Sequence, residues 1–163
     1  MYTGYLLAGA YVLHWLSIII WMGIYVSQLL LIGPSLKNVS TPDKIKIQVE
    51  ILARCPLLII TAIVVFVITG LIQIRFLYGF EYTFRHSIFN IKLFFVIVLI
   101  ANTLREMAFH KKFHSLMLGS EQHGSNTYAQ FNRQWQQVIW LQVALFILIL
   151  FISALLRIGY WDL

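Results

Sequence analysis

The chain has 163 residues, of which 60% are hydrophobic and only 11% are charged. Soluble domains carry about 25% charged residues, so this composition excludes a soluble globular domain and predicts one integral membrane domain over residues 1–163. The net charge of +6 does not point to nucleic acid, because the basic residues stand at the ends of apolar segments, where they anchor a membrane protein.

The first apolar segment covers about residues 5–33 and contains no charged side chain. It is long enough to cross a membrane as a helix, since a span needs about 20 apolar residues. The pair Gly33-Pro34 is typical of a helix end and predicts that the first span stops there.

The second span is expected at about 55–75, preceded by an amphipathic segment at about 43–53. Thr41 is the expected N-cap of that segment, with Pro42 at the first helical position. Pro56 would fall in the first turn of the second span, where its missing N–H leaves no helical hydrogen bond unmade.

The third span is predicted at about 87–108 and contains Lys92. We expect its helix to continue beyond the membrane through residues 105–114. A polar loop at 119–127 leads to the fourth span, at about 134–157. The expected fold is therefore all-α: an up-down-up-down bundle of four transmembrane helices.

Four spans place both termini on the same side of the membrane. Eight of the twelve Lys and Arg residues flank the loops that join spans 1–2 and 3–4, and four lie toward the other side. Because positive charge favours the cytoplasmic side, both termini are expected outside, in the periplasm, with the protein in a bacterial inner membrane.

A stripe of polar and aromatic side chains runs along one face of the first span: His14, Ser17, Trp21 and Gln28 recur at helical spacing. An ionisable side chain inside a membrane helix is costly and commonly marks a functional site. His14 lies roughly 13 Å into its helix at 1.5 Å per residue, within the outer leaflet.

Further cations are expected in the same outer half of the bundle. Lys92 enters span 3 from that side, and Arg75, His86 and Arg157 stand at or near the outer boundary. No acidic residue is expected to be buried there to balance them, since Glu81 and Asp162 fall in a loop and in the tail. Because buried charges need partners, this arrangement favours an anionic ligand.

A haem or porphyrin suits such a site, since imidazole is a standard axial ligand of haem iron and the propionates would meet Lys and Arg. His14 would be the metal ligand, with Trp21 and Ser17 beside the ring, while Lys92 with Arg75 or Arg157 would bind carboxylates. His86 is a candidate second ligand. A quinone head group is the next candidate, with His14 and Lys92 as hydrogen-bond donors.

Simpler interpretations apply to the same residues. His14 could donate to a neighbouring carbonyl, Lys92 could extend to the membrane surface, and Trp21 could be core packing. On the other side, His110 and His114 have the i, i+4 spacing of a metal pair, but the adjacent lysines favour a solvated basic helix end.

Several short motifs resemble the CopD/HemJ-like membrane proteins. The first helix, HWLSIIIWMG from His14, has the family's His followed seven residues later by Trp and then Gly. The second, from Arg54 to Gly70, is similar to its R-x-x-P…G helix. The third, NIKLFF from Asn90, looks like its W-x-x-K-L helix, with Lys92 on the lysine; Asn132-Arg133 before the last helix is similar to an Arg/Asn pair there.

The resemblance implies a membrane helix bundle and, in the HemJ branch, a b-type haem and oxidation of protoporphyrinogen, with His14 as axial ligand and Lys92 as a catalytic or carboxylate-binding partner. The expected function is therefore haem b or porphyrin binding in electron transfer or porphyrinogen oxidation. Alternatives are a non-enzymatic subunit or assembly factor of a larger membrane complex or homo-oligomer, and copper transport or resistance, as the CopD branch implies.

Overall fold

The computed structural model describes residues 2–79, 87–118 and 125–158, and every regular element within these ranges is helical. The elements are α1 (Tyr2–Ser27), a π-helical turn η1 (Gln28–Ile32), α2 (Gly33–Ser35), α3 (Thr41–Gln73), a second π-helical turn η2 (Ile74–Tyr78), α5 (Ser87–Leu118) and α6 (Ser125–Ile158). The prediction of an all-α fold is confirmed.

Four helical segments of the described chain are long and apolar enough to cross a membrane: Gly4–Ser35, Arg54–Phe76, Ile88–Phe109 and Asn132–Leu156. Most of the residues in each segment are not fully buried within the bundle, and many large apolar side chains are exposed and left to face lipid. The chain is therefore an integral membrane protein with four spans, as predicted.

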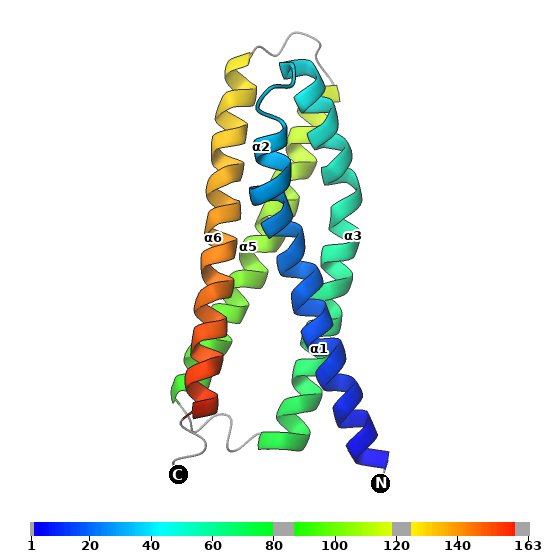
Figure 1. Ribbon diagram of the computed structural model, residues 1–163, viewed down its shortest axis with the longest axis vertical. Coiled ribbons are helices and arrows are strands. Elements are labelled where there is room, and N and C mark those ends of the chain that lie inside the picture. Colours follow the sequence, from blue (N-terminus) through cyan, green and yellow to red (C-terminus); the bar gives the residue numbers. More distant parts are fainter. Residues whose placement is uncertain (1, 80–86, 119–124, 159–163) are drawn as a thin grey trace.

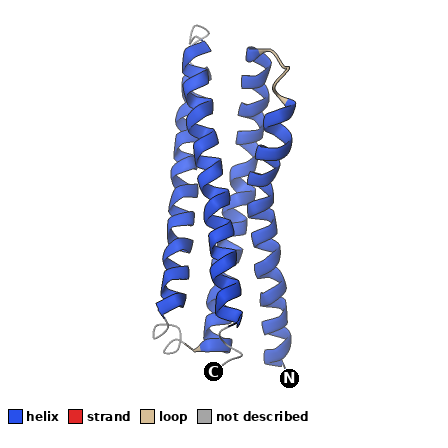
Figure 2. Cartoon of the chain, turned by 60° about the vertical axis from the view of Figure 1, so that its left-hand side comes forward, coloured by secondary structure: helices blue, strands red, loops and turns tan. Residues whose placement is uncertain are grey.

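The four long helices form one elongated antiparallel bundle (Figures 1 and 2). α1 packs mainly on α3, and α5 mainly on α6, while the two hairpins meet through weaker α1–α6 and α3–α5 contacts. We call the end where α1 begins and α6 ends the terminal end (Figure 1). The opposite end, where α1 connects to α3 and α5 to α6, is the hairpin end.

The bundle core is built from aromatic and aliphatic side chains of all four long helices. Trp21 of α1 is completely buried and contacts two rings edge-on, Phe66 of α3 at 5.9 Å and Phe146 of α6 at 5.0 Å between centroids. Such edge-to-face pairs are a favoured aromatic geometry. Trp21 therefore ties the two hairpins together near the middle of the membrane.

The first span ends within two residues of the predicted stop at Gly33-Pro34, but the helix passes through this pair and ends at Ser35. The wide turn of η1 lets the Gly33 N–H bond to the Gln28 carbonyl, five residues back. Proline has no N–H to donate and clashes with a regular preceding turn. The π-helical turn removes this conflict, so Pro34 lies in the first turn of α2 instead of ending α1.

Two details of α3 also differ from the prediction. The N-cap is Ser40, not Thr41, since the Ser40 hydroxyl oxygen accepts from the Asp43 N–H at 3.4 Å. Pro56 does not lie in a first turn, because α3 begins at Thr41 and carries the amphipathic segment into the membrane as one helix. Pro56 therefore removes one hydrogen bond from the interior of a helix.

The polar loop predicted at 119–127 is shorter than expected. α6 begins at Ser125, and residues 119–124 lie outside the described residues. The predicted extension of the third span as a helix is confirmed, because α5 runs to Leu118.

Candidate functional site

His14 of α1 is held against α3 by two contacts of one ring nitrogen. Its Nδ1 lies 3.2 Å from the Phe66 carbonyl oxygen and 3.0 Å from the Thr69 hydroxyl oxygen. The imidazole also stacks on the Phe66 ring, with centroids 4.5 Å apart and planes inclined by 22°. The ring therefore faces the bundle interior, and its orientation is fixed by α3.

These contacts favour a hydrogen on one ring nitrogen, Nδ1. A carbonyl oxygen only accepts, so the contact with Phe66 requires a donor at Nδ1. The single hydrogen of Thr69 is directed to its own helix, where the Val65 carbonyl lies 2.6 Å away. In the neutral imidazole Nδ1 is consequently the donor, and Nε2 keeps its lone pair. Metal-binding histidines commonly have this arrangement, with the second nitrogen donating to a carbonyl.

Gly70 provides the space that this ring position needs. A Cβ atom added to Gly70 would lie 3.3 Å from His14 Cε1 and 3.8 Å from Nδ1. The first distance is shorter than an ordinary van der Waals contact, so the imidazole lies almost directly against the α3 backbone. Glycine thus permits the close approach of α1 and α3 at the level of His14.

Two further nitrogen-bearing side chains, Lys92 and Gln73, lie in the same half of the bundle as His14, toward its terminal end. Lys92 of α5 is partly buried and lies within electrostatic range of His14. Gln73, one turn beyond Thr69 on α3, has a buried Nε2 with no hydrogen-bond partner in the described structure. No acidic residue of the described chain forms an ion pair with Lys92; the one ion pair there joins Arg54 and Glu50 at the hairpin end. Among the described residues, this part of the bundle therefore contains an unpaired donor and a cation without an acidic partner.

The other residues of the predicted site take different places. Ser17 and Trp21 are buried on the stripe that begins at His14. The Ser17 hydroxyl donates to the His14 carbonyl at 2.7 Å, so its hydrogen bond lies within α1. Arg75 is exposed in η2. His86 and the side chain of Arg157 lie outside the described part of the structure.

The structure brings Phe66, Thr69 and Gly70 of α3 to His14, and Gln73 follows on the same helix face; none of the four was predicted as a site residue. They recur at i, i+3, i+4 and i+7, which defines one face of a helix. That spacing was visible in the sequence, but Phe, Thr and Gly are common in any membrane helix. Within the described residues, no group of three or more His, Cys, Asp or Glu side chains could form a metal site.

A second polar group, which sequence reasoning missed, lies toward the hairpin end. The Glu106 carboxyl of α5 is only 4% exposed and accepts a 2.7 Å hydrogen bond from the Tyr25 hydroxyl of α1. Next to it, Gln142 of α6 is fully buried and donates to Thr103 and to the Leu99 carbonyl of α5. These contacts join α1, α5 and α6 inside the membrane.

Comparisons of the chain with protein-family models, with curated proteins and with solved structures found no match.

Proposed function

We propose that the protein binds a b-type haem or a related porphyrin at the terminal half of the bundle and acts in membrane electron transfer or porphyrinogen oxidation. The observation that carries this proposal is the position of His14, whose Nδ1 lies 3.2 Å from the Phe66 carbonyl oxygen. A hydrogen on Nδ1 satisfies this carbonyl and leaves Nε2 with a lone pair. Neutral imidazole in this state is a standard axial ligand of haem iron.

The residues near His14 suit the other parts of such a ligand. Lys92 is a partly buried cation with no anionic partner among the described residues, and a propionate would supply one. The unpaired Nε2 of Gln73 offers a further donor to a carboxylate. A bound haem would supply one-electron oxidation and reduction. A quinone carbonyl would use Lys92 and Gln73 but not the His14 lone pair, so His14 favours the porphyrin.

Space for a flat ring has to come from the seam between the two hairpins. α1 with α3, and α5 with α6, pack closely, whereas the contacts between these pairs are much weaker. Because His14 belongs to one hairpin and Lys92 to the other, a ligand in the seam would meet both. We infer that the seam, rather than the tight α1–α3 contact, accommodates the ligand.

The proposed setting is the inner membrane of a bacterium with both termini outside. Its support is the excess of basic residues toward the hairpin end, eight against four, which favours the cytoplasm on that side. The resemblance of the sequence motifs to CopD/HemJ-like proteins supports the proposal that the chain is a divergent member of that family, and it supports His14 as the axial haem ligand. In this proposal Lys92 binds a carboxylate or serves as the catalytic partner.

Gly70 provides a test that leaves every proposed ligand in place. We expect Gly70→Val to push the imidazole away from the α3 backbone and to weaken haem binding by about 10- to 100-fold, the usual effect of disturbing an outer partner of a metal ligand. The measurement is titration of the purified protein with haem, followed by Soret absorbance.

Gly23→Val is the matched control for this experiment. Gly23 is an exposed helical glycine whose added Cβ would meet nothing within 4 Å, so the substitution carries the same change in helix propensity without touching His14. Equal haem affinity of the two variants, or a wild-type protein that shows no Soret shift at all, would contradict the proposal.

A further inference from the structure

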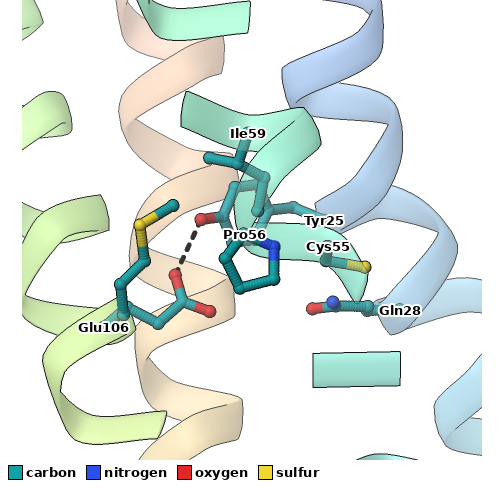
Figure 3. A pocket seen from close by; sticks show the side chains of 7 residues that line it. Tyr25, Gln28, Cys55, Pro56, Ile59 and Glu106 are labelled. Atoms are coloured by element: carbon teal, nitrogen blue, oxygen red, sulfur yellow. Dashed lines mark hydrogen bonds between the residues drawn. The ribbon is translucent and has the colours of Figure 1, made fainter. Parts of the chain in front are cut away.

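Two small cavities lie in the hairpin half of the bundle, and both are lined by Gln28. The first is bordered by Tyr25, Cys55 and Glu106 and is drawn in Figure 3. The second is bordered by three further amide side chains, those of Gln48, Asn132 and Gln136. Each is large enough for about one water molecule, and both are polar enough to bind it.

Gln28 connects the two cavities and lacks a partner of its own. Its side chain is 7% exposed, and its Oε1 accepts no hydrogen bond in the described structure. In Figure 3 its amide points across the Pro56 ring toward the Glu106 carboxyl. A buried amide oxygen without a donor is costly, so a donor such as water is expected there. Gln28 also begins the π-helical turn η1, and such turns frequently occur at functional sites.

The polar side chains around the cavities lie one after another from the hairpin end toward the interior of the bundle. Gln136 is exposed on α6 near the hairpin end, and Gln48 is buried on the first turns of α3. Gln28 comes next, and Glu106 lies beyond it within the third span. A carboxyl group inside a transmembrane helix commonly marks an ion or proton pathway.

We propose that Glu106 is a proton-binding site that is reached from the hairpin end of the bundle through these two cavities, with Gln28 as the connecting group. A proton carried by a water in the first cavity adds to a Glu106 carboxylate oxygen and leaves that water neutral. The Tyr25 hydroxyl donates to Oε2 at 2.7 Å and so fixes the orientation of the carboxyl. The inference does not depend on a haem at His14.

The groups that face Glu106 from the packed helices are consistent with this role. Tyr25 on α1 donates to the carboxyl, Cys55 on α3 lies within electrostatic range of it, and the uncharged Gln142 of α6 binds Thr103 on the preceding turn of α5. Arg105, next on α5, turns to Asn102, to which it donates at 3.0 Å. The carboxyl therefore lies in a polar region whose outlet is the cavity at Gln28.

The test is infrared spectroscopy of the full-length protein in lipid nanodiscs, titrated with acid. A protonated-carboxyl C=O band should grow as the pH falls, should be missing in Glu106→Gln, and should move to higher wavenumber in Tyr25→Phe because one hydrogen bond is lost. After transfer to D₂O, the deuterium shift of this band should be at least about tenfold slower in Gln28→Leu, where the relay acceptor is gone.

Ser153→Ala is the control, because the Ser153 hydroxyl is bonded to its own helix at Ile149, outside the cavities. Gln136→Leu fills the second cavity from an exposed position and keeps the test open if Gln28→Leu loses helicity by circular dichroism. A titrating band that persists unchanged in Glu106→Gln, or equal exchange rates in the wild type and both leucine variants, would overturn the inference. Neither readout requires haem, so failure here is distinct from failure at His14.

Discussion

His14→Ala should abolish the Soret band of ligated haem. The substitution removes the one described side chain at the terminal half of the bundle whose geometry suits axial ligation, with Nδ1 held by Phe66 and Nε2 left with a lone pair. Lys92 and Gln73 would remain and could still bind the haem carboxylates. We therefore expect the variant to bind haem weakly, without the Soret band of histidine-ligated iron. Optical titration of the purified variant measures both parts.

Ser27→Ala is the matched control for this result. Ser27 lies on the same helix, and its hydroxyl donates to the Ile24 carbonyl at 2.9 Å, so its removal leaves the His14 region untouched. Its haem spectrum should be that of the wild type. An unchanged Soret band in His14→Ala would assign the iron to a different ligand and remove the proposed role of His14.

Trp21→Ala should cause the largest loss of stability of any single truncation in the bundle. The indole is completely buried and contacts Phe66 and Phe146 on two different helices. Truncating a buried Trp costs about 3–5 kcal/mol in soluble proteins. We expect about 3 kcal/mol here, because the lost contacts are dispersion and packing contacts rather than transfer from water.

Trp140→Ala gives the comparison, since Trp140 is 57% exposed on α6 and belongs to the lipid-facing surface. Its effect should stay within about 0.5 kcal/mol, as for most surface substitutions. Unfolding in mixed micelles, followed by circular dichroism, gives both values. Similar losses for the two variants would mean that Trp21 does not hold the hairpins together.

The four spans and their antiparallel order could be predicted from the sequence because they depend on composition and length. Runs of about 20 uncharged residues cross a membrane almost regardless of their detailed contacts. Helix ends were predicted less well, because charged residues were taken to mark them. Arg54 lies at the membrane boundary, yet α3 begins at Thr41, so Pro56 is an interior residue rather than a first-turn one.

The stripe on the first helix was predicted as a face, and the structure places Ser17, Trp21 and Gln28 in the bundle interior with His14 half-buried. The partners of that face could not be predicted, because helical period fixes which side chains lie together on one helix but not the register of a second helix. The contact of His14 with Phe66 and Gly70 depends on that register.

The buried position of Glu106 also could not be predicted from the sequence. From the sequence, the helix was expected to leave the membrane over residues 105–114, and Glu106 was given no role. In the structure Glu106 turns inward to Tyr25, eighty-one positions away in the chain, whereas Arg105 is exposed. Adjacent helical residues point in directions about 100° apart, so a charged segment can still carry one buried acid.

The bundle thus has two polar regions separated along α5. Lys92 marks the region near His14, and Glu106 marks the region near Gln28, about 21 Å farther along the helix at 1.5 Å per residue. Among the described residues, the first has an unpaired donor in Gln73 and no acidic side chain in an ion pair with Lys92, whereas the second has an unpaired acceptor in Gln28. This opposite polarity is why we assign an anionic ligand to one region and a proton to the other.

The most direct test of the account is nitrogen NMR of the protein labelled with ¹⁵N-histidine, with the His14 signals assigned by their loss in His14→Ala. Before haem is added, Nδ1 of His14 should carry the hydrogen and Nε2 should have the shift of an unprotonated nitrogen. Addition of haem should then displace the Nε2 signal selectively. A hydrogen on Nε2 in the free protein, or His14 signals that stay unchanged when haem is added, would contradict the assignment of His14 as an iron ligand.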